Sequence, residues 1–341
     1  MKLVTFEVPT PLGPLRRTGA LHAEVVIDLP LARAALLATG GRPRARAIAE
    51  AEVPADMLEL LRGGDWAIEA ARDALDHAVR DGIERFDDAT VRHAIGTVRL
   101  LSPLPRPNSL RDFLVVEEHL RNAYRTLGRE DQFPAEWYNV PAHYKGNVDA
   151  IYGPEDEVPY PSYTELLDYE LEICAVVGRA GRRISADDAA AHIAGYTIYN
   201  DWSARDIQMR ESSIGIGPGI GKDFATSLGP CIATPDEFDP ATSRLEARID
   251  GETWSSGTLA AMHFSFPEII EYFTQEEEAQ PGDVLGSGTI GGGCGLEFGR
   301  YLAPGMTVEL EAEGIGILRN TVGPKGPANP RWVAAQDLER M

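Results

Sequence analysis

The segment DYELEICAVVG, residues 168–178, constrains the fold of this 341-residue chain more than any other part of it. Apolar residues run through the segment, and among them Glu170 and Glu172 stand two positions apart. Side chains two apart in a strand point to the same face, so the pattern predicts a strand with two carboxylates on one side. Buried carboxylates are costly unless a partner compensates them, and oxygen ligands suit Mg²⁺, Ca²⁺ or Mn²⁺. The alternative is the exposed face of an edge strand, on which both glutamates are solvated.

Three closely spaced prolines, Pro103, Pro105 and Pro107, divide the chain into two parts. Proline has no N–H for a sheet ladder and disrupts helices, so this stretch predicts an extended linker. Before it, residues 1–100 mix strand patterns with two helical patterns, which predicts a small α+β N-terminal domain. After it, residues 101–341 contain more strand patterns than helical ones. They predict a larger domain that is mostly β with some α.

A helix is predicted over residues 109–127, because Val116, Leu120, Ala123 and Leu127 form a stripe at helical spacing. Asp112 at its start is either a metal ligand or the partner of Ser109 in a capping box. His119 would lie two turns after Asp112 on the same side. Histidine is suited to proton transfer near neutral pH, but a surface histidine is the alternative.

Further polar side chains follow the strand pattern GYTIYN, residues 195–200. Asp201 comes directly after it, as a ligand at the strand end or as a turn residue. Arg205 and Gln208 are three apart and would share one face of a helix, and Lys222 follows in a glycine-rich loop. Such donors suit the stabilisation of an oxyanion. The alternative for Arg205 is a salt bridge to Asp201 or Asp206.

Two glycine-rich segments do not carry nucleotide-binding motifs. GIGPGIGKDF lacks the first Gly of a phosphate-binding loop, because Ile216 stands there, and has Asp223 in place of Ser or Thr. GSGTIG, residues 286–291, fits GxGxxG but runs on into more glycines instead of a helix. We interpret both as loops in which the backbone approaches a ligand closely.

Charge and cysteine content exclude several classes of partner. With 32 Lys and Arg against 53 Asp and Glu, the formal net charge is −21, which disfavours nucleic acid and anionic membrane surfaces. No apolar run approaches the roughly 18 residues of a membrane span, and no signal peptide is visible. The three cysteines form no CxxC pair, which favours a reducing compartment and predicts a cytoplasmic protein.

Taken together, the motifs resemble those of the fumarylacetoacetate hydrolase family over about residues 101–320. The resemblance implies a mixed β-sandwich roll as the C-terminal domain, a smaller N-terminal domain and a homodimer. Its carriers, in chain order, are DFLVVEEH (112–119), PAHYKG (141–146), DYELEICAVVG (168–178), NDWSARDIQ (200–208), GKDF (221–224) and GSGTIGGGCGLE (286–297).

The same resemblance implies roles for individual residues. It implies metal ligands at Asp112, Glu170, Glu172 and Asp201. It implies that His119 activates water, assisted by Glu297, and that Arg205, Gln208 and Lys222 hold the substrate and its oxyanion. Tyr144 and Thr289 match positions that contact substrate. The segment 289–297 is short and the loop ESSIGIGPGI differs in content, so the identity of the substrate stays open.

The expected activity is metal-dependent hydrolysis of a C–C bond in a 1,3-dicarbonyl or acylpyruvate-type acid, with Mg²⁺ as the cofactor and Ca²⁺ or Mn²⁺ as alternatives. Its expected ligand is a small anionic keto acid. The runner-up is a decarboxylase, a tautomerase or isomerase, or a sugar-acid dehydratase on the same metal–enolate site. A non-catalytic binding protein is the third interpretation.

Overall fold

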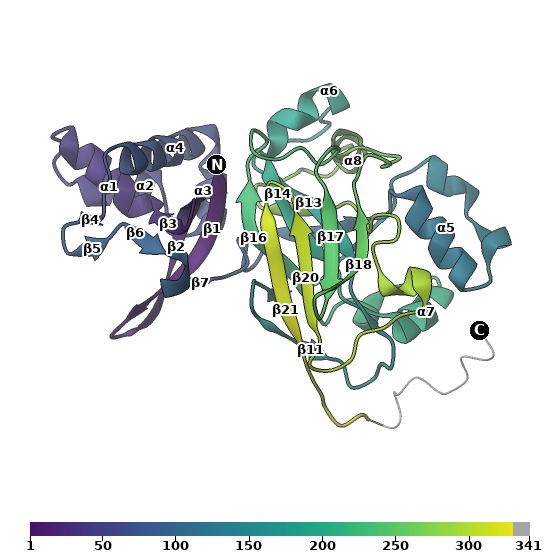
Figure 1. The fold of residues 1–341 in the computed structure, drawn as a ribbon. Coiled ribbons are helices and arrows are strands. Elements are labelled where there is room, and N and C mark those ends of the chain that lie inside the picture. The colour runs from purple at the N-terminus through teal and green to yellow at the C-terminus, as the bar shows by residue number, and fades with distance from the viewer. Residues whose placement is uncertain (330–341) are drawn as a thin grey trace.

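The computed structural model describes residues 1–329 and has two lobes joined by one sheet (Figure 1). In the N-terminal lobe, helices α1–α4 pack on strands β1–β3. Strand β1 also pairs antiparallel with β16 of the larger lobe, so the sheet continues between the lobes. The bounds are β1 Lys2–Thr10, β2 Gly13–His22, β3 Val25–Asp28, α1 Leu29–Thr39, α2 Ala45–Glu52, α3 Met57–Arg62, α4 Gly64–Arg80 and β16 Thr226–Ala233.

The larger lobe packs this mixed sheet against a second one, as expected for the strand-rich fold predicted from the sequence. The first sheet runs in the order β6-β3-β2-β1-β16-β14-β13-β19-β8-β9, and the second in the order β11-β21-β20-β17-β18. The core between them contains Ile173 and Ile198 from the first sheet and Leu245 and Leu310 from the second. Bounds in the first sheet are β6 Arg92–Ala94, β8 Ser109–Phe113, β9 His143–Lys145, β13 Leu171–Val177, β14 Ile193–Asn200 and β19 Asp283–Gly286. Those in the second are β11 Glu157–Tyr160, β17 Leu245–Ile249, β18 Glu252–Gly257, β20 Thr307–Ala312 and β21 Gly316–Lys325.

An apolar core also crosses the predicted boundary at residue 100. Leu3 and Leu60 of the N-terminal lobe belong to the same buried cluster as Val176, Tyr199 and Ile232 of the larger lobe. The division into residues 1–100 and 101–341 stays a prediction, and residues 330–341 lie outside the described residues.

The helix predicted over residues 109–127 is wrong in its first half. Ser109–Phe113 is strand β8, parallel to β19 and antiparallel to β9, and helix α5 spans only Glu117–Thr126. Ser109 does not cap a helix; its hydroxyl donates to Asp283. The apolar stripe corresponds to a helix only from Val116 onward. In residues 109–113, hydrogen bonds to two neighbouring strands favour a strand instead. Asp112 and His119 therefore lie on different elements.

Other predicted elements near the site are confirmed. Strand β14 ends at Asn200, directly before Asp201, and helix α7 spans Arg205–Ser213. Elsewhere in the larger lobe, Ser185 caps the short helix α6, Ala186–Ala189, and α8 spans Phe266–Phe273.

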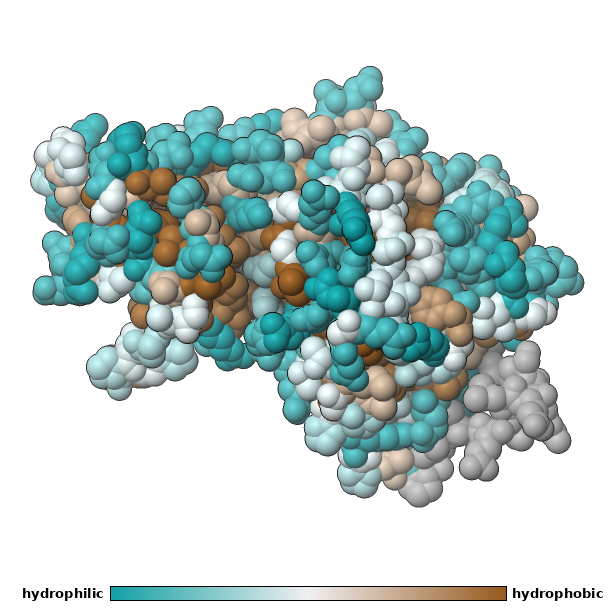
Figure 2. All heavy atoms as spheres, viewed as in Figure 1, coloured by the Kyte–Doolittle hydropathy of each residue, from teal (hydrophilic) through white to brown (hydrophobic). Residues whose placement is uncertain are grey.

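The surface is largely hydrophilic on the face shown in Figure 2, with hydrophobic side chains gathered mainly over the N-terminal lobe. Among the helices of residues 1–329, none has both the length and the apolar character needed to cross a membrane.

Candidate active site

Four carboxylates in or directly beside strands β8, β13 and β14 meet in the larger lobe: Asp112, Glu170, Glu172 and Asp201. One oxygen atom from each lies within 4.8 Å of the others. All four side chains are buried, and Glu172 and Asp201 have no exposed surface. Strand β13, which carries Glu172, lies between β14 and β19 inside the sheet. The alternative of a solvated edge strand is therefore wrong.

Sheet register brings these carboxylates together from distant parts of the sequence. Leu171 of β13 pairs with Asn200 of β14, which places their neighbours Glu170 and Asp201 side by side. Asp112 of β8 pairs with Gly286 of β19. A Cβ atom at Gly286 would lie 2.5 Å from Asp112 Oδ1 and 3.3 Å from Glu172 Oε2. Glycine at this position leaves room for both carboxylates.

Two buried, positively charged side chains contact the same cluster. Lys222 Nζ donates to Glu170 Oε2 and, at 2.5 Å, to Asp201 Oδ2. Arg205 donates to Glu170 Oε1 at 2.9 Å and to the carboxylate of Asp168 at 2.8 Å. Arg205 thus forms salt bridges, but not with Asp201 or Asp206 as the sequence suggested.

These contacts separate the pKa values of the four acids. Burial opposes ionisation of Glu170, but Arg205 and Lys222 overcome it and lower its pKa. Burial and the neighbouring carboxylates raise the pKa of Asp112 and Glu172 well above their usual values. Burial also raises the pKa of Asp201, to about 6, against the opposing effect of Lys222. Negative charge therefore accumulates here only at a free-energy cost.

The donor set fits a divalent cation. Glu172 Oε2 and Asp201 Oδ1 are buried oxygens without a hydrogen-bond partner within residues 1–329. Buried acceptors of this kind are destabilising unless something binds them. Four carboxylates within ligand range of one another are the oxygen-rich donor set that Mg²⁺, Mn²⁺ and Ca²⁺ prefer.

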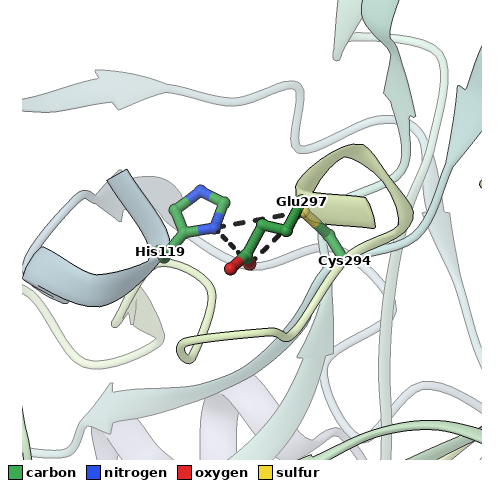
Figure 3. A group of neighbouring side chains, drawn as sticks. All are labelled: His119, Cys294 and Glu297. Carbon is green, nitrogen blue, oxygen red and sulfur yellow. Dashed lines mark hydrogen bonds and ion pairs between the residues drawn. The ribbon is translucent and has the colours of Figure 1, made fainter. Parts of the chain in front are cut away.

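A histidine–glutamate pair adjoins this cluster. His119 on α5 faces Glu297 on the turn Gly295–Phe298 (Figure 3), with Nδ1 2.8 Å from Glu297 Oε1. The other ring nitrogen, Nε2, lies 4.0 Å from Glu170 Oε1. Asn122 and the backbone N–H groups of Gly292 and Gly293 donate to Glu297 and fix its carboxylate. One nitrogen of His119 is thus anchored, and the other faces the carboxylate cluster.

Cys294 lies beside this pair but is a poor metal ligand. Its Sγ is 3.9 Å from His119 Nδ1 and 3.7 Å from Glu297 Oε1. Burial raises the pKa of the Cys294 thiol well above its usual value. Metals bind the thiolate, which is disfavoured here. We therefore interpret His119 and Glu297 as a hydrogen-bonded pair with Cys294 beside it, and not as a second metal site.

A cavity of about 540 Å³ opens onto both groups and includes the remaining predicted residues. Tyr144 donates to Asp201 Oδ2 at 2.6 Å, and Thr289 donates to Glu172 Oε1 at 3.3 Å. Gln208 accepts from Arg205 at 3.1 Å. The structure thus brings together all eleven predicted site residues, while their individual roles stay predictions.

Sequence reasoning missed two residues that hold this site together. Asp168 binds Arg205, and Asn122 binds Glu297. Asp168 precedes Glu170 by two positions in the DYELE motif, so strand alternation was a signal for it. Nothing in the local sequence distinguished Asn122 from other polar residues of α5.

A mixed β-roll that presents a buried carboxylate cluster beside a histidine defines the class to which this protein belongs. Residues 110–323 match the family described as "Fumarylacetoacetate (FAA) hydrolase C-terminal". The chain belongs to the fumarylacetoacetate hydrolase family, which confirms the resemblance.

Two similar proteins carry the same activity in their names. The chain is 29% identical over 276 residues to "Oxaloacetate tautomerase YisK" of Bacillus subtilis (strain 168), covering 80% of this chain and 87% of that protein. It is 30% identical over 328 residues to "Oxaloacetate tautomerase FAHD2A, mitochondrial" of Bos taurus, covering 94% and 91%.

Solved structures agree with the fold. A fumarylacetoacetate hydrolase from Exiguobacterium antarcticum aligns with a TM-score of 0.68 at 25% identity, over 95% of this chain and 99% of that one. A maleylpyruvate hydrolase from Sphingobium sp. SYK-6, in complex with manganese(II) and pyruvate, aligns with a TM-score of 0.65 at 19% identity, over 95% and 99%.

Proposed function

We propose that this protein is a divalent-metal-dependent enzyme that moves a proton on a small 2-oxo acid, and that keto–enol tautomerisation of oxaloacetate is its first candidate reaction. The observation that best supports this proposal is the placement of His119, with Nδ1 2.8 Å from Glu297 and Nε2 facing the carboxylates. Relatives named oxaloacetate tautomerases, similar over most of their length, support the reaction class. On this support we propose tautomerisation, which belonged to the runner-up from the sequence, ahead of hydrolysis.

Asp112, Glu170, Glu172 and Asp201 would hold the cation, for which we propose Mg²⁺, with Mn²⁺ or Ca²⁺ as alternatives. When bound, it supplies Lewis-acid polarisation of a carbonyl oxygen.

The protein's own residues supply the proton transfer. In the tautomer in which His119 Nδ1 donates to Glu297, Nε2 carries the lone pair. Nε2 would take a proton from the carbon next to the carbonyl and return it to oxygen, or the reverse. Arg205 and Lys222 hold positive charge at the site, against the net charge of −21, and so favour an anionic substrate. Gln208, Tyr144 and Thr289 shape the same cavity.

Hydrolysis of an acylpyruvate-type C–C bond is the second candidate. In that reaction Nε2 of His119 would take its proton from water, and Arg205, Gln208 and Lys222 would stabilise the oxyanion. A cavity of about 540 Å³, within the range of about 300–1,000 Å³ that holds drug-sized ligands, favours a substrate larger than oxaloacetate. Decarboxylation and sugar-acid dehydration would use the same oxyanion-stabilising side chains. The intact His119–Glu297 pair argues against a non-catalytic binding protein.

One set of incubations separates these reactions. The Mg²⁺-loaded protein is mixed with enol-oxaloacetate, with an acylpyruvate and with a keto-deoxy sugar acid, and products are identified by NMR. We expect accelerated ketonisation of oxaloacetate without loss of CO₂. If the ketonisation of oxaloacetate is not accelerated and only the acylpyruvate is cleaved, hydrolysis is the function. If no substrate is turned over, the enzymatic proposal fails.

Assembly and location also remain proposals. We propose a homodimer, to be tested by light scattering coupled to gel filtration. A monomer at micromolar concentration would contradict it. The three cysteines are free thiols, in keeping with the predicted cytoplasmic location.

A further inference from the structure

The cavity continues beyond the carboxylates along one side of α5. The wall along α5 starts at His119, passes Leu120 and Ala123, and ends at Leu127, the residue directly after the helix. Eight residues of α-helix rise about 12 Å, so this wall extends roughly two turns away from His119. A four-carbon diacid held at the carboxylates and His119 would not reach its outer end.

The α5 side of this outer end is largely aliphatic, and Tyr124 and Arg129 also line it. Ala123 and Leu296 are each 6% exposed and form a small cluster of their own with Cys294, against which Leu127 packs. Met209 of α7 also lines the cavity. The aliphatic side chains, unlike Tyr124 and Arg129, offer no donor to a second substrate carboxylate. They would gain from covering a hydrocarbon group, because burial of apolar surface is favourable.

We propose that the site accepts 2-oxo acids that carry an apolar chain beyond the fourth carbon, with the oxo-acid head at the carboxylates and the chain along Ala123, Leu127 and Leu296. This inference rests on the proposed function, since it names a substrate class for the same site. It predicts binding that strengthens with chain length.

Straight-chain 2-oxo acids of three to eight carbons provide the test. Each is titrated by calorimetry into the Mn²⁺-loaded full chain. We expect the dissociation constant to fall about fourfold per methylene beyond the fourth carbon, equivalent to about 0.8 kcal/mol, until the cavity is filled. Constant or weaker binding along the series would overturn the proposal.

Matched variants locate the effect. Leu127→Asn should flatten the dependence on chain length. Arg125→Asn should preserve it, because Arg125 is in the same helical turn but does not line the cavity. Equal effects of both would contradict the placement of the chain. Turnover of oxaloacetate is measured separately, so a failed chain-length series with active enzyme rejects only this inference. The opposite pattern rejects only the proposed function.

A second and independent observation concerns Asp168, a fully buried carboxylate outside the cavity lining. Its Oδ2 accepts from Arg205 Nε at 2.8 Å and from the backbone N–H of Leu296 at 3.0 Å. Its Oδ1 accepts from the backbone N–H of Gly295 at 2.8 Å. One carboxylate thus holds both Arg205 and the start of the turn that carries Glu297.

The packing around this carboxylate is tight. A Cβ atom at Gly295 would lie 2.7 Å from Asp168 Oδ1 and would clash with the carbonyl oxygen of Arg300. The position of the turn is therefore set closely by Asp168. We infer that Asp168 is a positioning residue that fixes Arg205 and the His119–Glu297 pair relative to each other.

Asp168→Asn tests this role against Asp206→Asn. Asp206 is also buried and also accepts hydrogen bonds, from Thr164 and from the backbone N–H groups of Glu165 and Ile207, but it does not contact Arg205 in this way. We expect Asp168→Asn to weaken pyruvate binding, to lower kcat on oxaloacetate about 10- to 100-fold and to shift the pH profile of kcat. Mn²⁺ affinity should stay within about threefold, because Asp168 is outside the four-carboxylate set.

The control variant should lose thermal stability without shifting the pH profile. If the two variants behave alike, or if Asp168→Asn keeps the wild-type profile and pyruvate affinity, Asp168 is only structural. If Asp168→Asn does not fold, Asp168→Glu, which keeps the charge but displaces it, is measured in the same way.

Discussion

The imidazole Nδ1 of His119 lies 2.8 Å from Glu297 Oε1, although 178 positions separate the two residues in the chain. Helix α5 supplies the histidine and a glycine-bounded turn supplies the carboxylate. Because Glu297 is itself held by Asn122 and two backbone N–H groups, the ring has a fixed direction. A histidine oriented in this way is suited to act as a base toward the carboxylate cluster.

Replacement of His119 by alanine should abolish turnover while metal binding survives. A positioned general base contributes about 10²–10⁴-fold, so His119→Ala should lower kcat by that factor. Its Mn²⁺ affinity, measured by calorimetry, should change little because His119 is outside the four-carboxylate group. His192→Ala, at a half-buried histidine outside the cavity lining, is the control. Wild-type turnover in His119→Ala would show that His119 is not the catalytic base.

Glu172→Gln should separate metal binding from folding. Burial and Asp112 raise the pKa of Glu172, so the protonated carboxyl is favoured without a cation, and glutamine resembles it in shape. We expect the melting temperature of the metal-free variant to stay within about 4 °C of wild type, roughly 1 kcal/mol. The increase in melting temperature on addition of Mn²⁺ should disappear. A variant that retains this increase would show that Glu172 is not a ligand.

Metal binding should tighten as the pH rises from about 5 to 7. The pKa of Asp201 is raised to about 6, so below that pH its carboxylate is mainly protonated and a cation must displace the proton. In the metal-free protein, a raised carboxyl pKa gives stability that is lost as the pH rises through it, and a bound cation reverses this loss. Calorimetry in buffers of different ionisation enthalpy should detect proton release. Affinity that is independent of pH over this range would contradict the prediction.

Lys222→Met should destabilise the metal-free protein by about 3–5 kcal/mol, since it removes the cation paired with Asp201 and leaves Arg205 as the countercharge of Glu170. Lys222 contacts both Glu170 and Asp201 and is almost fully buried. Lys145→Met is the matched control, because Lys145 is exposed and its ion pair with Glu277 is worth at most about 1 kcal/mol. Urea unfolding measures both. Equal losses in the two variants would show that Lys222 does not stabilise the cluster.

Much of the site could be predicted from short sequence motifs. Strand alternation in DYELE placed Glu170 and Glu172 on one side, and the end of β14 placed Asp201. Local patterns failed at residues 109–113, where helical spacing continued into a segment that sheet neighbours hold as a strand. Pairing with β19 and β9 is a long-range interaction that no local window contains.

The sequence by itself determined the residue types of the site, the family and the acidic balance of the chain. Only the tertiary structure decided that Asp168 binds Arg205, that Lys222 lies between Glu170 and Asp201, and that β1 joins the sheet of the larger lobe. The physical reason is that burial and partner choice set the state of a charged group. Both depend on which distant strands are adjacent, and sheet register, rather than sequence proximity, fixes that.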